Sequence, residues 1–368
     1  MADLTTEDLR AAVAAGMIDE RAAARLTAFA DEREGRRALM PQEDEPFEFF
    51  RGFGEIFIAV GLLLFFGALH ALGLVMGGAW DGKGPGGFTS GLGLAAAWAL
   101  AVYFTRRRRM SLPSIVLACV FAIDLASVLA VMLYRAFGGL FANVAGQGSL
   151  SLLALAALGV GGMAIYYRVF RLPFALLPLG LFGLVFAMAT ARWVAPWPVG
   201  RADFPVAVFD LAQSPTISLG MLAFGLAAFL VAMRFDMRDP HRLGRHAASA
   251  FWLHILAAPA LVNTVCLTLY NMGGVLGYVA TAAGFFLMAL LALVIDRRSF
   301  LMAGVVYAGL ALGAAFEAAG GDNAFGAILT VGLLGGGITL LGAHWARARA
   351  SVMRALPNFA IKRRLPPY

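Results

Sequence analysis

The sequence predicts an all-α fold, a polytopic bundle of about ten transmembrane helices with both termini in the cytoplasm. Of the 368 residues, 61% are hydrophobic and only 14% are charged, whereas a soluble domain carries about 25% charged residues. Apolar segments recur along the chain, and each is long enough to cross about 30 Å of hydrocarbon at about 1.5 Å per residue. The loops between these segments alternate between arginine-rich and arginine-poor, as in multi-pass membrane proteins.

The apolar segments divide the chain into four regions. We expect a soluble helical hairpin over residues 1–40, an acidic linker over 41–50, a transmembrane bundle over 51–346 and a basic cytoplasmic tail over 347–368. The expected spans cover residues 54–77, 87–105, 112–134, 149–167, 172–191, 216–233, 248–270, 274–295, 299–318 and 324–345.

Charge predicts the orientation of these spans. With ten spans, 25 of the 29 Lys and Arg side chains fall on the side that holds both termini. Positive residues are retained on the cytoplasmic side of short loops. Both ends should therefore be cytoplasmic, and we expect the protein in the inner (plasma) membrane.

The first 40 residues should form a short helical hairpin. Thr5 with Asp8 resembles a capping box, and Gly16 is a natural helix end in the left-handed region. The hairpin pattern and the following Gly-rich span, GEIFIAVGLLLFFGALHALG from Gly54, resemble a class of bacterial inner-membrane proteins of unknown function. The pattern is carried by Leu9, Val13, Gly16, Ile18, Ala23 and Leu26. The resemblance implies the location but no activity.

Asp124 is the strongest single candidate for a functional residue, because it lies in the middle of an apolar span. A charged Asp at the bilayer centre costs roughly 2.5–3.5 kcal/mol, so its side chain should face other helices. It is either a proton, cation or ligand site, or a structural carboxyl bonded to a neighbouring helix, with Ser127 close by on the same chain.

The span over 248–270 holds a second group of candidates: His254, Pro259 and Asn263. Proline removes a helix donor and favours a kink, and a broken helix can line a polar cavity. His254 and Asn263 share a face only if that kink forms. A packed histidine and a packed asparagine are the simpler interpretation.

Three further polar sites carry weaker signals. Glu317 lies near the end of an apolar span and His70 in the outer third of the first one, and both are secondary candidates for an ion or substrate pathway. Asp296, Arg297 and Arg298 are expected to form a local charge cluster at the inner interface.

Several kinds of chemistry find no support in the sequence. It contains no Walker A, HExxH, GxSxG or kinase motif. Cys119 and Cys266 are the only cysteines, and both lie in apolar spans without metal-ligand spacing. We therefore expect no cofactor, no metal and no catalytic residues. Basic residues in short loops indicate membrane orientation rather than nucleic-acid binding.

The C-terminal tail should lie on the cytoplasmic membrane surface, where anionic lipid headgroups attract basic residues. We expect its arginines and lysine to remain solvated, while the apolar side chains of Val352, Met353 and Leu356 insert among the headgroups. The basic residues are Arg347, Arg349, Arg354, Lys362, Arg363 and Arg364. The alternative is a disordered tail whose charges only fix the topology.

Three functions remain open on this basis. The first is secondary transport or flipping of a small or lipidic solute, indicated by the mid-membrane Asp124 and the expected kink. The second is a non-catalytic envelope scaffold or regulator that binds a protein partner through the N-terminal hairpin. The third, an intramembrane enzyme, has the least support because no cluster of polar groups marks an active site. The bilayer itself is the one partner common to all three.

Overall fold

A computed structural model describes residues 11–18, 22, 53–75, 86–137, 150–195, 208–239, 245–318, 323–357, 362 and 365–366. The chain divides into two compact units, Met1–Glu45 and Pro46–Tyr368. Throughout the described ranges the regular structure is helical, with no strand. This confirms the predicted all-α class.

In the first unit, the described residues include one helix end. Gly16 has φ +69°, and the N–H of Met17 donates to the carbonyl of Ala12 at 3.0 Å. A left-handed glycine with a bond spanning five residues is a common way to end a helix, so Gly16 plays the role predicted for it. The rest of the expected hairpin, apart from Ala22, and the linker over 41–50 lie outside the described residues.

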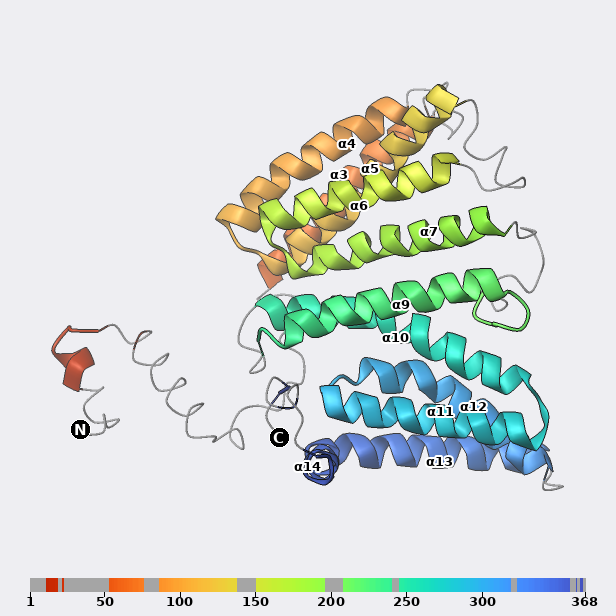
Figure 1. Ribbon diagram of the computed structural model, residues 1–368. Helices are drawn as coiled ribbons and strands as arrows, with labels where there is room; N and C mark the ends of the chain where they lie inside the picture. Colours follow the sequence, from red (N-terminus) through yellow and green to blue (C-terminus); the bar gives the residue numbers. More distant parts are fainter. Residues whose placement is uncertain are drawn as a thin grey trace. The chain divides into compact units, whose positions relative to one another are not determined.

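The second unit contains a helix for every predicted span (Figure 1). The elements are α3 (Phe53–Val75), α4 (Gly86–Ala101) continued by η2 (Val102–Arg107), α5 (Ser111–Phe137), α6 (Leu150–Phe170), η3 (Pro173–Ala175) with α7 (Leu176–Val194), α9 (Pro215–Asp236), α10 (Arg245–Asn271), α11 (Gly274–Ile295), α12 (Ser299–Ala318), α13 (Asn323–Ala343) and α14 (Trp345–Ala355).

Eight of these helices are long and apolar enough to cross a membrane, which makes the chain a multi-pass membrane protein. A ninth span results if α13 and α14 count as one, although the chain bends by 76° between them. Helix α12 is apolar over Ser299–Leu310. The total of ten spans stays a prediction.

The two largest apolar cores of the described bundle lie side by side in sequence order. Side chains of α3 to α7, joined by Trp252 of α10, form the first, around Phe66, Leu117 and Tyr166. Side chains of α9 to α14 form the second, around Val262 and Phe300. Helix α7 lies beside α9, and α10 contacts both (Figure 1). α10 is the most buried of the eight long apolar helices.

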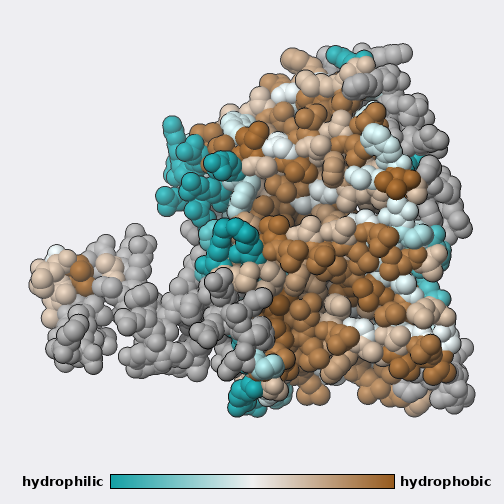
Figure 2. All heavy atoms as spheres, in the orientation of Figure 1, coloured by the Kyte–Doolittle hydropathy of each residue, from teal (hydrophilic) through white to brown (hydrophobic). Residues whose placement is uncertain are grey.

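The surface of the bundle separates apolar flanks from a polar end. Large apolar side chains such as Phe57, Ile165 and Phe286 are exposed along the helices, as a lipid-facing surface requires. In Figure 2 most strongly hydrophilic atoms gather at one end of the helices. We call this the arginine-rich end, after the exposed arginines in the last turn of η2, α6 and α9 or just beyond it: Arg106–Arg109, Arg168, Arg171, Arg234 and Arg238.

Helix α14 corrects part of the expectation for the tail. Arg349 is 3% exposed, Met353 0% and Lys362 8%, so these side chains are buried in the protein and do not meet headgroups. The helix is amphipathic, as its sequence predicts, but its apolar edge packs on the second core. Arg363 and Arg364 lie outside the described residues.

Candidate functional site

His70 and Asp124, which the sequence singles out separately, are in contact between α3 and α5. His70 Nε2 lies 2.7 Å from Asp124 Oδ1, and His70 Nδ1 lies 2.6 Å from the carbonyl oxygen of Phe66. The Asp124 side chain is 0% exposed, whereas the His70 side chain is 34% exposed. The pair therefore joins a buried carboxyl to a half-exposed imidazole within two apolar helices.

Helix α4 makes room for this carboxyl. The ideal Cβ position at Gly93 would overlap Asp124 Oδ2, so only glycine allows α4 to approach so closely. That oxygen has no hydrogen-bond partner among the described residues. Ser127, which the sequence offered as a neighbour for Asp124, instead donates to the carbonyl of Ile123 at 2.9 Å.

The hydrogen-bonding pattern fixes how many protons the pair holds. A carbonyl oxygen only accepts, so His70 Nδ1 must carry a hydrogen and donate it to Phe66. A neutral imidazole with its hydrogen on Nδ1 has a lone pair on Nε2, which a carboxylate would repel. The 2.7 Å contact therefore requires a further proton between Nε2 and Oδ1. Whether it resides on the ring or on the carboxyl, the pair is electrically neutral with that proton.

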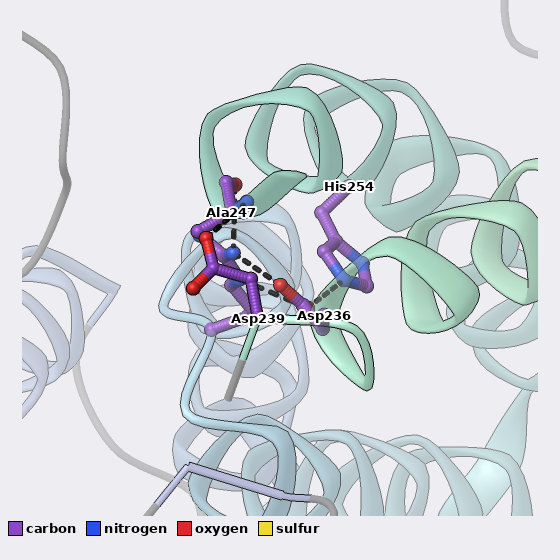
Figure 3. Close-up of polar contacts among 5 residues, drawn as sticks. Asp236, Asp239, Ala247 and His254 are labelled. Carbon is purple, nitrogen blue, oxygen red and sulfur yellow. Dashed lines mark hydrogen bonds and ion pairs between the residues drawn. The ribbon is translucent and has the colours of Figure 1, made fainter. Parts of the chain in front are cut away.

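A second buried polar cluster lies at the arginine-rich end of the second core (Figure 3). His254 Nε2 is 2.9 Å from Asp236 Oδ2, and Arg297 donates from Nη2 to Asp236 Oδ1 at 2.5 Å. Arg297 Nη2 also donates to the carbonyl of Ala247 at 3.0 Å. The backbone N–H of Ala247 donates in turn to Asp239 at 3.3 Å.

This second cluster ties three parts of the fold together. Asp236 ends α9, His254 lies in α10, and Arg297 lies in the turn between α11 and α12. All three side chains are 3% exposed or less. The positive charge of the buried guanidinium balances the negative charge of the carboxylate, as a buried ion pair requires. We interpret the cluster as a structural contact that holds these helices together.

The structure separates the candidates of α10. His254 is buried against Asp236, Asn263 is half-buried more than two turns further along, and Pro259 is exposed. Helix α10 runs unbroken from Arg245 to Asn271 through Pro259. A shared role of the three residues in an ion or substrate pathway stays a prediction.

Two other expectations concern the charged residues at 296–298 and Glu317. The structure adds distant partners to the charge cluster expected at Asp296–Arg298: Arg297 reaches Asp236, and Asp296 accepts a hydrogen bond from Trp345 Nε1 at 2.8 Å. Glu317 belongs to the last turn of α12, but its side chain lies outside the described part of the chain.

Sequence reasoning missed Asp236 as a member of this cluster. At the end of an apolar span, next to Arg234 and Arg238, it is typical of an interfacial charge. The sequence does hold one indication of the contact. Asp236 is the last residue of one apolar span, and His254 follows 18 residues later in the next span.

Metal ligation has no support in the described residues, where no three His, Cys, Asp or Glu side chains lie close enough to hold an ion. Cys119 and Cys266 are not joined by a disulfide.

No protein-family model, curated protein or solved structure matches this chain.

Proposed function

We propose that this integral membrane protein is a proton-coupled secondary transporter or flippase, which moves a small or lipidic solute and uses His70 and Asp124 as its proton site. One observation carries the proposal. An imidazole and a carboxyl from different helices are in contact within apolar helices, and their geometry requires a shared proton.

The energetics of the bilayer support coupling between that proton and the conformation. With the proton the pair is neutral, which an apolar surrounding tolerates. Without it a net negative charge remains, and a charged Asp at the centre of a membrane helix costs roughly 2.5–3.5 kcal/mol. Release of the proton therefore favours a state in which water or another group reaches Asp124. Two states of different proton affinity are the basis of coupled transport.

The environment of the pair also supports exchange. The Asp124 side chain is buried, but the His70 side chain is 34% exposed. The imidazole therefore connects the buried carboxyl to the surface of the bundle. Since imidazole titrates near neutral pH when unperturbed, it is suited to pass a proton on to a buried carboxyl.

Protons themselves are the probe in the test. The purified full-length protein is reconstituted on a solid-supported membrane, and the charge displaced by a pH jump is recorded. We expect the wild type to displace charge and Asp124→Asn to lose most of that displacement. Ser127→Ala is the matched control, because its hydroxyl donates to the Ile123 carbonyl of its own helix.

A solute assay then separates the two forms of transport. Flipping of a fluorescent phospholipid in proteoliposomes under a pH gradient should be lost in Asp124→Asn if the solute is lipidic. A wild type without pH-driven charge displacement, or an Asp124→Asn variant that retains it with the fold intact, would contradict the proposal. That result would favour the alternative, a non-catalytic envelope scaffold or regulator.

The proposed location is the inner (plasma) membrane, with both termini in the cytoplasm. The asymmetric distribution of arginine supports it. In the scaffold alternative, the N-terminal hairpin binds a protein partner.

A further inference from the structure

Helix α14 is firmly anchored through one of its faces. Trp345, Arg349 and Met353 follow one another at intervals of four residues and are all buried. Arg349 Nε donates to the carbonyl of Leu293 at 3.0 Å, and its Nη2 donates to the carbonyl of Pro366 at 2.6 Å. Trp345 is held by Asp296 in the turn between α11 and α12. The helix thus has a fixed position on the bundle.

The opposite face of α14 carries exposed positive charge. Arg347 and Arg354 are both exposed and lie seven residues apart, about two turns along the same side of the helix. Ser351, between them, is exposed as well. No acidic residue occurs in this helix, so its two exposed arginines have no counter-charge in α14 itself.

The direction of α14 places this face at the membrane boundary. The chain turns by 76° after α13, and Figure 1 shows α14 end-on beside the end of α13. Ile328, Val331 and Leu340 of α13 are exposed apolar side chains, typical of a lipid-facing helix. A helix that lies across the end of such a span runs along the headgroup layer.

We propose that Arg347 and Arg354 of α14 bind the headgroups of anionic phospholipids in the adjacent leaflet. A guanidinium binds phosphate oxygens in a bidentate manner, and two arginines on a rigid helix present such donors without ordering a flexible tail. The site therefore differs from the surface-lying tail expected from the sequence, since Arg349 and Lys362 bind carbonyl oxygens inside the protein and, among the described basic residues of the tail, Arg347 and Arg354 are the exposed ones.

Native mass spectrometry of the full-length protein in detergent can test this by titration with phosphatidylglycerol or phosphatidylcholine. Each basic group near an anionic surface contributes enough for about a fivefold change in affinity. We expect Arg347→Gln/Arg354→Gln to weaken the tightest phosphatidylglycerol binding by about 25-fold. Binding of phosphatidylcholine should not change.

The matched control removes the same charge elsewhere at the arginine-rich end. Arg106→Gln/Arg107→Gln changes two exposed arginines of η2 and should weaken the tightest binding less than about threefold, because general attraction is screened over about 8–10 Å. The variant Arg347→Lys/Arg354→Lys keeps both charges but loses the bidentate donors, so it should bind phosphatidylglycerol more weakly than the wild type and more tightly than Arg347→Gln/Arg354→Gln.

Several outcomes would overturn the proposal. One is an equal loss in both double glutamine variants, which means that only the general charge of this end matters. Another is equal binding of the two lipids, which would leave an acidic protein as the better occupant. A third is displacement of phosphatidylglycerol by millimolar glycerol phosphate, which would indicate a site for a soluble phosphate.

Discussion

At the scale of single residues, two of the three buried aspartates in the described part of the bundle, Asp124 and Asp236, are each held by a histidine, but their charge balance differs. Among the described residues, Asp124 has His70 as its one hydrogen-bond partner and needs a shared proton to be neutral. Asp236 meets both His254 and the guanidinium of Arg297, which supplies a permanent positive charge. The first arrangement is suited to gain and lose a proton, whereas the second is suited to hold helices in place.

Gly93 should be essential for the packing of Asp124. A methyl group at this position overlaps the carboxyl, so Gly93→Ala must displace Asp124 or α4. We expect a loss of about 1–3 kcal/mol in the free energy of unfolding, typical of overpacking, and weaker contact with His70. Gly91→Ala is the control, because a Cβ there meets nothing within 4 Å. Thermal unfolding in detergent measures both, and equal melting temperatures would contradict the close approach.

The cluster at Asp236 should behave as a coupled unit. Removal of one partner leaves a buried charge uncompensated, so Asp236→Asn and Arg297→Gln should each cost about 3–5 kcal/mol. The double variant has no uncompensated charge and should cost clearly less than the sum. Unfolding by titration with a denaturing detergent gives the three values. Additive losses would show that the two side chains do not interact.

At the scale of helices, α14 depends on Arg349 for its position. Arg349 donates to two carbonyls, and hydrogen bonds from charged groups are worth about 1.5–3 kcal/mol each. We expect Arg349→Gln to release α14 and speed hydrogen exchange of its amides by more than about tenfold.

Exchange measured by mass spectrometry tests this prediction. Arg347→Gln changes an exposed arginine of the same helix and should leave the exchange unchanged. If α14 exchanges equally slowly in both variants, other contacts hold it.

The helices themselves were predictable from local sequence, but their contacts were not. Each of the ten expected spans coincides with a helix to within a few residues, because a span is defined by its own apolar length. The contact of His70 with Asp124 joins residues 54 positions apart, and no local pattern encodes which helices become neighbours. The contact of Arg297 with Asp236 joins residues 61 positions apart and was not predicted for the same reason. From the sequence, Arg297 was grouped only with its neighbours Asp296 and Arg298.

At the scale of the whole molecule, the arginine distribution should determine the topology. We use a reporter enzyme that is active only in the cytoplasm. It should be active both when it is fused after residue 48 and when it is fused to the C-terminus. The physical reason is that 25 of 29 basic side chains lie on that side of the ten-span arrangement. An external reporter at one end alone would require an odd number of spans, and α12 and the bent pair of α13 and α14 are where the count can change. External reporters at both ends would instead reverse the predicted orientation.

The buried cluster at Asp236 has a consequence for how the protein is made. Arg297 follows Asp236 by 61 residues, and ribosomes add about 5–20 residues per second. For roughly 3–12 s a newly inserted α9 therefore ends in a carboxyl group whose guanidinium has not yet been synthesised. His254 emerges much earlier, only 18 residues after Asp236, and can hold the carboxyl during that interval. Biogenesis of this protein thus passes through a stage in which the insertion machinery must shelter a half-assembled charge pair, and a nascent chain stalled before Arg297 would be a natural substrate for membrane quality control.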